Sequence, residues 1–147
     1  MKELIIISFI ACLLSCNGYD ASPVWMLAGA DGMTTEKGIV KMNDVVFTGN
    51  LYSLYPAGDT EYVRHYVAGR LDGESRGWYP GGQLKFVYHY KDDVYEGRVE
   101  EWFSNGQQYR SFNYVNGQEE GLQTMYWDNG KLRANYESKN GRKYGFT

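Results

Sequence analysis

Aromatic and apolar residues alternate with polar residues in short runs that stop at glycine. The clearest case is the segment from Gly97 to Glu120, GRVEEWFSNGQQYRSFNYVNGQEE. One run ends with an aromatic pair followed by Ser-Asn-Gly, and a second run ends at Asn116-Gly117. Short alternating runs are typical of half-buried strands, and Asn-Gly favours a type I′ turn because both central positions need positive φ. The segment is therefore predicted to be a β-hairpin with both of its turns.

The same unit recurs along the chain. Glycines spaced by 24 residues begin each copy: Gly49, Gly73, Gly97, Gly121 and Gly145. A second series marks the inner turn: Gly58, Gly82, Gly106 and Gly130. The outer turn carries Gly69, Gly117 and Gly141, with Asp93 in the second copy. A fixed period of this length is the signature of a repeat architecture. We expect an all-β fold in which about four 24-residue β-hairpin repeats form one elongated, twisted antiparallel sheet.

An aromatic pair precedes each inner turn, except that the first copy has Leu54-Tyr55. The other pairs are Trp78-Tyr79, Trp102-Phe103 and Tyr126-Trp127. Adjacent strand residues point to opposite faces, so each pair should place one ring on each face. On the strand after each inner turn, the even positions are expected to form the packed face and the odd positions the polar face. The even set includes Leu84, Phe86, Tyr88, Gln108, Phe112, Leu132 and Tyr136, and the odd set includes Lys85, Tyr109 and Arg133.

The chain divides into four predicted parts. Residues 49–147 form the repeat domain, and residues 39–48 form capping strands with a turn near Asn43-Asp44 that should cover the open edge of the first repeat. Residues 17–38 are rich in Gly, Ala and Asp and are predicted to be a tether, in which Trp25-Met26-Leu27 is expected to cap the first repeat. The sequence stops three residues into a fifth unit, so we expect the array to end there with an exposed sheet edge or with an unusually short cap.

Residues 1–16, MKELIIISFIACLLSC, are predicted to be a signal peptide. The apolar run from Leu4 to Ser15 falls short of the roughly 20 residues that a membrane-spanning helix needs, and it fits a secretory h-region. Its end, Leu-Leu-Ser-Cys16, resembles a bacterial lipobox, which implies that Cys16 is lipidated and becomes the mature N-terminus. A plain cleaved signal and a buried first element are the alternatives.

The lipobox reading determines the expected location and disulfide content. The two cysteines, Cys12 and Cys16, both lie in this segment, so the mature chain could form no internal disulfide. The expected location is the bacterial cell envelope, with the membrane reached through the lipid on Cys16. The outer membrane is favoured over the inner because Asn17, rather than Asp, follows Cys16.

Composition excludes other classes of protein. The chain has 14 Tyr, 4 Trp and 6 Phe, which is far too aromatic for a disordered segment. Its net charge is −3, whereas nucleic-acid-binding domains usually carry an excess of positive charge, so no nucleic-acid partner is expected.

The repeat motif resembles a known family. The runs GESRGWYPGG, GRVEEWFSNG and GLQTMYWDNG follow the pattern Gly-x4-Trp/Tyr-aromatic-x2-Gly and resemble the MORN repeat variant of bacteria over residues 49–145. The resemblance implies a meandering, twisted sheet of hairpins. Some bacterial members are labelled antitoxins, and eukaryotic relatives serve as membrane-apposed scaffolds. The family has no catalytic motif to transfer.

Candidate chemistry is sparse. His65 and His89 occupy equivalent positions in adjacent units, about 9–10 Å apart, which is too far for a shared zinc ion. Glu100 and Glu101 are neighbours and should point to opposite faces, so they cannot act as a carboxylate couple. Four arginines (Arg64, Arg76, Arg98 and Arg110) are expected to cover aromatic rings with their stems rather than to stack on a ligand. We expect no metal, no cofactor and no enzymatic activity.

The sequence therefore predicts a non-enzymatic, membrane-anchored lipoprotein that acts as a binding or scaffold module for a protein or an envelope glycan. The candidate binding residues belong to two aromatic series: Trp78, Trp102 and Tyr126, or Tyr79, Phe103 and Trp127. The sequence does not decide between the two series. The alternative is an antitoxin or immunity-type protein that binds and neutralises a toxin.

Overall fold

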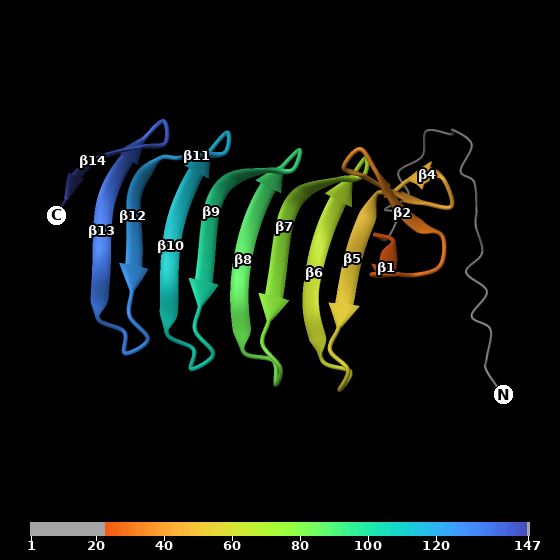
Figure 1. The fold of residues 1–147 in the computed structure, drawn as a ribbon, viewed down its shortest axis with the longest axis horizontal. Helices are drawn as coiled ribbons and strands as arrows, with labels where there is room; N and C mark the ends of the chain where they lie inside the picture. Colours follow the sequence, from red (N-terminus) through yellow and green to blue (C-terminus); the bar gives the residue numbers. More distant parts are fainter. Residues whose placement is uncertain (1–22, 147) are drawn as a thin grey trace, which may run out of the picture.

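The computed structural model describes residues 23–146, so the predicted signal peptide, Cys16 and the start of the predicted tether lie outside the described residues. An eleven-stranded sheet runs in the order β1-β5-β6-β7-β8-β9-β10-β12-β13-β14, with β11 paired to β10, and a three-stranded sheet runs in the order β2-β3-β4 (Figure 1). The strands are β1 (Trp25–Leu27), β2 (Met33–Glu36), β3 (Ile39–Met42), β4 (Val45–Val46), β5 (Gly49–Leu54), β6 (Thr60–Val67), β7 (Arg70–Trp78), β8 (Leu84–Lys91), β9 (Val94–Trp102), β10 (Gln108–Val115), β11 (Gln118–Glu119), β12 (Gly121–Tyr126), β13 (Leu132–Lys139) and β14 (Arg142–Phe146). The predicted all-β repeat fold is confirmed.

Both predicted sets of turns are present. At an inner turn, the Gly106 N–H donates to the Phe103 carbonyl at 2.9 Å and the Phe103 N–H donates to the Gln107 carbonyl at 2.8 Å. The same two bonds recur at the other three inner turns. At an outer turn, Asn116 and Gly117 have φ of 50° and 76°, as a type I′ turn requires.

Neighbouring outer turns are joined by backbone hydrogen bonds. The second turn residue of each unit donates its N–H to a carbonyl in the preceding unit, at 2.7–3.0 Å. The four bonds are Gly69 to Phe47, Asp93 to Leu71, Gly117 to Tyr95 and Gly141 to Glu119. The repeats are therefore locked in register at this edge of the array, independently of their side chains.

Each repeat begins with a glycine that bends the chain. Gly73, Gly97 and Gly121 have φ of 94°, 86° and 76°, in the region that favours glycine. The strand register shifts beside the first two of them. Beyond the bend, Tyr95 lies against Tyr88, with ring centroids 5.6 Å apart, so the outer hairpins fold over one face of the sheet.

That face, which we call the packed face, buries the third residue of every unit. Leu51, Ser75, Val99 and Gln123 are only 3%, 2%, 0% and 0% exposed. Their cross-strand partners include Tyr88, Phe112 and Tyr136. Gln123 is satisfied by the backbone, because its amide exchanges hydrogen bonds with the N–H and the carbonyl of Asn113.

The predicted alternation is wrong close to the inner turns, because each strand that follows one carries a β-bulge. Glu61, Lys85, Tyr109 and Arg133 are the extra residues, and each is skipped in the register. Glu61 accepts a hydrogen bond from Ser53 on the packed face at 2.8 Å, whereas Gln108 donates to Glu100 on the other face. Residues before the bulge (Leu84, Gln108 and Leu132) therefore lie on the face opposite to the one predicted.

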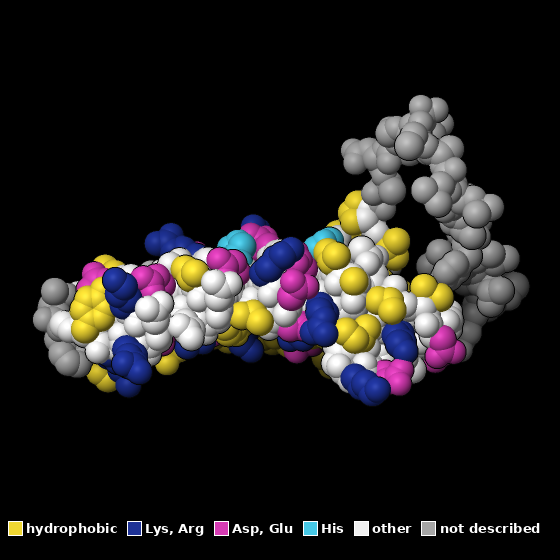
Figure 2. Space-filling view, turned by 90° about the horizontal axis from the view of Figure 1, so that it is seen from above, with side chains coloured by type: hydrophobic (Ala, Val, Ile, Leu, Met, Phe, Trp, Pro, Cys, Tyr) yellow, Lys and Arg dark blue, Asp and Glu magenta, His cyan; other side chains and the backbone are white. Residues whose placement is uncertain are grey.

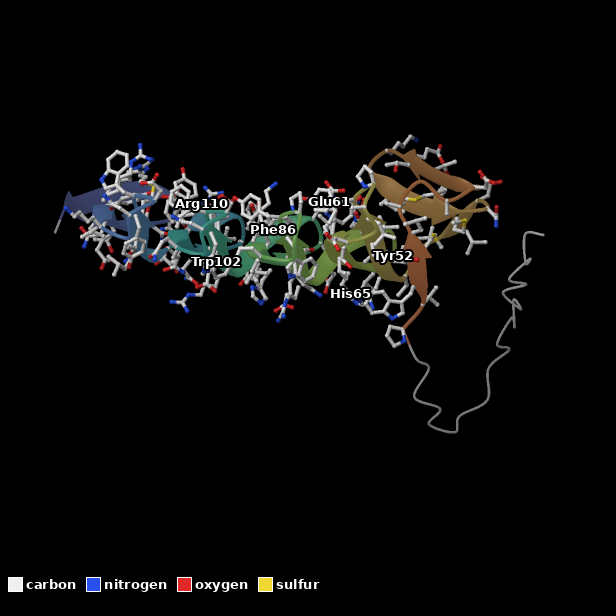
Figure 3. The ribbon with its side chains drawn as sticks, turned by 90° about the horizontal axis from the view of Figure 1, so that it is seen from below. Tyr52, Glu61, His65, Phe86, Trp102 and Arg110 are labelled. Atoms are coloured by element: carbon white, nitrogen blue, oxygen red, sulfur yellow. The ribbon has the colours of Figure 1, made fainter. Side chains whose placement is uncertain are left out.

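We call this opposite surface the open face. One row of directly paired residues crosses it from strand to strand: Tyr52, Val63, Arg76, Val87, Glu100, Ser111, Thr124 and Asn135. Figure 3 shows the two faces edge-on, with Glu61, Phe86 and Arg110 on one side and Tyr52, His65 and Trp102 on the other.

The N-terminal cap differs from the prediction in part. Residues 39–48 form two strands around Asn43-Asp44 that pair with each other, and β3 also pairs with β2, but neither pairs with the edge strand β5. They do cover the first repeat, because Val40 and Phe47 hydrogen-bond to Gly69 and pack with Leu51 and Tyr66. The edge is covered by β1, which pairs in parallel with β5. The described part of the expected tether is thus folded, and Trp25-Met26-Leu27 caps the first repeat as predicted. Figure 2 shows hydrophobic side chains gathered at this end and charges of both signs along the repeats.

Ser75 is the weak point of the packed face. Its hydroxyl is buried and has no hydrogen-bond partner among the described residues, at a position where other units place Leu51 and Val99. We predict that Ser75→Val raises the free energy of unfolding by about 1 kcal/mol, because it removes an unsatisfied buried hydroxyl. The converse change, Val99→Ser, should lower it by about 2 kcal/mol.

Urea unfolding followed by far-UV circular dichroism measures both changes, with exposed Arg98→Ala as the neutral control. Equal losses of stability for Ser75→Val and Val99→Ser would contradict the assignment of Ser75 as unsatisfied.

Candidate binding surface

The structure separates the two aromatic series. The second residue of the pair makes contacts within the repeat array itself. Tyr79 donates its hydroxyl to the Trp102 carbonyl at 2.9 Å, and Tyr55 does the same to Trp78 at 2.8 Å. The ring of Trp127 carries the Arg133 guanidinium at 4.5 Å from its centroid. This series stabilises the inner turns and lies on the side of the bulge residues.

The first residue of each pair lies on the open face. Trp78, Trp102 and Tyr126 are paired with Leu84, Gln108 and Leu132, the residues that the bulge moves to this face. Figure 3 shows Trp102 on the same side as Tyr52 and His65. The structure thus assigns the outward aromatic row, a choice that the sequence left open.

Trp25 extends this row at its N-terminal end. The first unit has Leu54 where the others have an aromatic residue, and Trp25 lines a shallow hollow together with Trp78, Val63 and Thr60. The volume of this hollow is about 450 Å³, within the range of roughly 300–1,000 Å³ that is common for ligand sites. Trp25 is 55% exposed, with its ring centroid 6.4 Å from that of Tyr52.

An adjoining hollow of about 290 Å³ is lined by Trp25, Val63, Trp78 and the ion pair of Glu74 with Arg76. Trp25 also borders a hollow of about 440 Å³ on its other side, between β1 and the small sheet, whose lining includes Leu27, Met42 and Tyr52. Three hollows therefore meet at Trp25. The sequence offered one signal for this location, an isolated Trp ahead of a repeat that lacks its own.

Two groups of charged side chains on the open face are paired. Arg76 contacts Glu74, and His89 Nε2 lies 3.6 Å from the same carboxylate. Glu100 accepts a hydrogen bond from Gln108 at 3.1 Å and lies 3.8 Å from Arg98. Such exposed pairs add little to stability, but they place donors and acceptors beside Trp78 and Trp102.

The packed face holds a different cluster, whose role is structural. Glu101 accepts hydrogen bonds from the Tyr88 hydroxyl and from Arg110 Nη2, the latter at 2.6 Å. Burial, reinforced by this carboxylate, raises the pKa of Tyr88 well above its usual value. Burial and the nearby Glu119 likewise raise the pKa of Tyr136 to about 12. These phenols stay neutral at physiological pH and act as hydrogen-bond donors.

The histidines make ordinary strand contacts. His65 Nδ1 lies 3.0 Å from Asn50 Oδ1, and His89 Nδ1 lies 2.9 Å from the Arg98 carbonyl oxygen. Within residues 23–146, no three side chains of the types that bind metals come together. Glu100 and Glu101 contact opposite faces, as predicted.

The four arginines divide into two kinds. Arg64 and Arg110 lie over Tyr62 and Phe112, with guanidinium carbons 4.3 and 5.3 Å from the ring centroids, as expected. Arg76 and Arg98 instead lie beside Glu74 and Glu100 on the open face.

Two segments of the chain match the MORN repeat variant. They are residues 71–92 and 119–140. The first spans most of β7 and all of β8, and the second spans β12 and β13. The hairpin between them, β9–β10, has the same turns and the same buried position. MORN repeats are generally associated with binding and scaffold roles.

No curated protein and no solved structure matches the chain. In the described part of the chain, no helix has the length and apolar character needed to cross a membrane.

The tyrosine hydroxyls that donate from one inner turn to the next unit, which we call the hydroxyl ladder, generate a prediction. Tyr79→Phe removes the bond to the Trp102 carbonyl and should lower the free energy of unfolding by about 0.5–1.5 kcal/mol. Phe103 occupies the equivalent position and has no hydroxyl, so Phe103→Tyr should extend the ladder to Tyr126 and raise stability by a similar amount. Urea unfolding measures both, and changes of the same sign would show that the hydroxyl is not the stabilising group.

Proposed function

We propose that this protein is a non-enzymatic binding or scaffold module, held at the bacterial cell envelope by a lipid on Cys16, with the open face as its binding surface. The observation that carries the proposal is the row formed by Trp78, Trp102 and Tyr126. The second aromatic series is tied to the scaffold, whereas this row lies on the surface that the outer hairpins leave uncovered. Tyr and Trp suit such surfaces because each has an apolar body and a polar tip.

The anchor is supported by the lipobox-like sequence at residues 13–16 and by its distance from the folded domain. Seven residues, and thus eight Cα–Cα steps, separate Cys16 from Val24, and a fully extended chain of eight steps reaches roughly 26–29 Å at 3.3–3.6 Å per residue. A lipidated Cys16 would therefore keep the cap end of the array close to the bilayer. The outer membrane is the favoured location.

The second candidate is an antitoxin or immunity-type protein, which the resemblance to bacterial MORN variants supports. It would use the same open face, but its partner would be a toxin. An antitoxin that acts in the cytosol needs no lipid, whereas an immunity protein at the cell surface could use one. The state of Cys16 therefore separates the anchored protein from a cytosolic antitoxin, and the identity of the partner separates it from an immunity protein.

Lipidation is tested by metabolic labelling with a clickable fatty acid. The wild-type protein should take up label and fractionate with the envelope, because the thiol of Cys16 is the predicted acylation site. Cys16→Ala should take up none. Cys12→Ala is the matched control and should label normally, since Cys12 lies in the removed segment. Label on Cys16→Ala, or an unlabelled wild type in the cytosol, would refute the anchor and favour the antitoxin.

Use of the open face is tested by covalent cross-linking in the envelope fraction, followed by identification of the captured protein or glycan. Trp102→Ala should lose the captured partner because it removes the central ring of the row. Trp127→Ala is the control, since Trp127 is a tryptophan that is 50% exposed, more than the half-buried Trp102, but carries Arg133 over its ring and belongs to the other series. Capture that depends on Trp127 and not on Trp102 would contradict the proposal, because it would place the binding surface on the packed face.

A further inference from the structure

The spacing of the outward aromatic row limits the ligands that can use it. Successive rings lie in successive hairpins, and a hairpin is two strands wide, so the rings repeat about every 9–10 Å. The hairpins follow one another along the long axis of the array (Figure 1), so the row runs across the strands in that direction. A ligand that contacts every ring must be linear and must have a repeat of the same length. One disaccharide of a β-1,4-linked polysaccharide is about that long.

The chemistry around the rings is what a sugar needs. A pyranose has an apolar C–H face that stacks on Trp or Tyr and a rim of hydroxyls that both donate and accept hydrogen bonds. Each of the two central units places such partners beside its ring, with Glu74 and Arg76 near Trp78 and with Glu100 and Gln108 near Trp102. Because the acids beside Trp78 and Trp102 are paired with Arg76 and Arg98, this part of the face favours an uncharged ligand over a polyanion.

A proline-rich peptide is the main competitor. A polyproline II helix rises about 9.3 Å per turn of three residues and also stacks on aromatic rings. Its backbone offers only carbonyl acceptors wherever proline stands. Arg76 and Gln108 already donate to the carboxylates of Glu74 and Glu100, but each carboxylate keeps further lone pairs. Sugar hydroxyls can donate to these lone pairs, and prolines cannot.

We propose that the open face binds a linear, uncharged, β-1,4-linked polysaccharide, with one disaccharide on each aromatic-bearing repeat. The glycan enters at the hollow between Trp25 and Trp78 and runs past Trp102 to Tyr126. This inference rests on the proposed function, because it names the ligand of the same surface. Trp25 supplies the ring that the first unit lacks, so the row of rings starts at the cap.

The test is a titration of the full chain with β-1,4-linked oligomers of N-acetylglucosamine and of glucose, from dimer to octamer. Calorimetry and tryptophan fluorescence report binding. Affinity should rise with each added disaccharide until the oligomer spans the row and should then level off, because each repeat adds one linked contact. An affinity that is independent of length overturns the proposal.

The variants locate the site. Trp102→Ala should weaken the longest oligomer about tenfold, which corresponds to about 1.4 kcal/mol. Trp102→Tyr keeps an aromatic ring, so its affinity for the longest oligomer should be almost that of the wild type. The affinity of Trp127→Ala should equal that of the wild type. Circular dichroism confirms that each variant is folded. Binding that Trp102→Ala leaves intact overturns the proposal.

Failure of the proposal can be told apart from failure of the proposed function. If no oligomer binds and a proline-rich peptide does, in a Trp102-dependent manner, the ligand class is wrong and the open face is still the binding surface. If no oligomer binds and envelope capture still needs Trp102, the partner is a protein and the glycan proposal falls. If neither oligomer binding nor envelope capture depends on Trp102, both proposals are wrong.

Discussion

The bend at the glycine that begins each repeat is the constraint on which the rest of the structure depends. Gly73, Gly97 and Gly121 adopt positive φ, a conformation that costs other L-residues about 1–2 kcal/mol. The bend turns the outer hairpin over one face of the sheet. A flat meander of the same strands would leave Val99 in water, whereas the bent one buries it completely. The array thus obtains a core from a sheet that is mostly one layer thick.

The bend also makes the two faces unequal. On the packed face, Glu101 accepts hydrogen bonds from Tyr88 and from Arg110 beneath the folded hairpins, although Arg110 Nε has no partner among the described residues. The open face is not covered in this way, so its rings and paired charges remain available for contact. The two faces differ because the outer hairpins cover only one of them. They do not differ in the kinds of residue present, since both carry Tyr and Glu.

Each unit contacts only its neighbours, and this fits the cross-unit bonds at both ends of the hairpins. Backbone donors of the outer turns reach the preceding unit, and tyrosine hydroxyls of the inner turns reach the following one. The stability of such an array is approximately a sum of unit and interface contributions. Its first unit is therefore a special case, and β1 and the small sheet cover the edge and the core that it would otherwise expose.

The sequence by itself determined the repeat, its period and both kinds of turn, because these depend on local requirements such as positive φ at Gly117 and Gly106. It also predicted the opposite orientations of Glu100 and Glu101. Lipidation of Cys16 stays a prediction, since Cys16 lies outside the described residues.

Only the tertiary structure decided which aromatic series faces outward. A bulge at Lys85 and Tyr109 reverses the alternation, and such an insertion is defined by the partner strand rather than by its own residues. The parallel pairing of Trp25 with Asn50, inside a segment expected to be a tether, was equally hidden. It joins residues far apart in the chain, and no local pattern encodes a contact whose register is set by a distant strand edge.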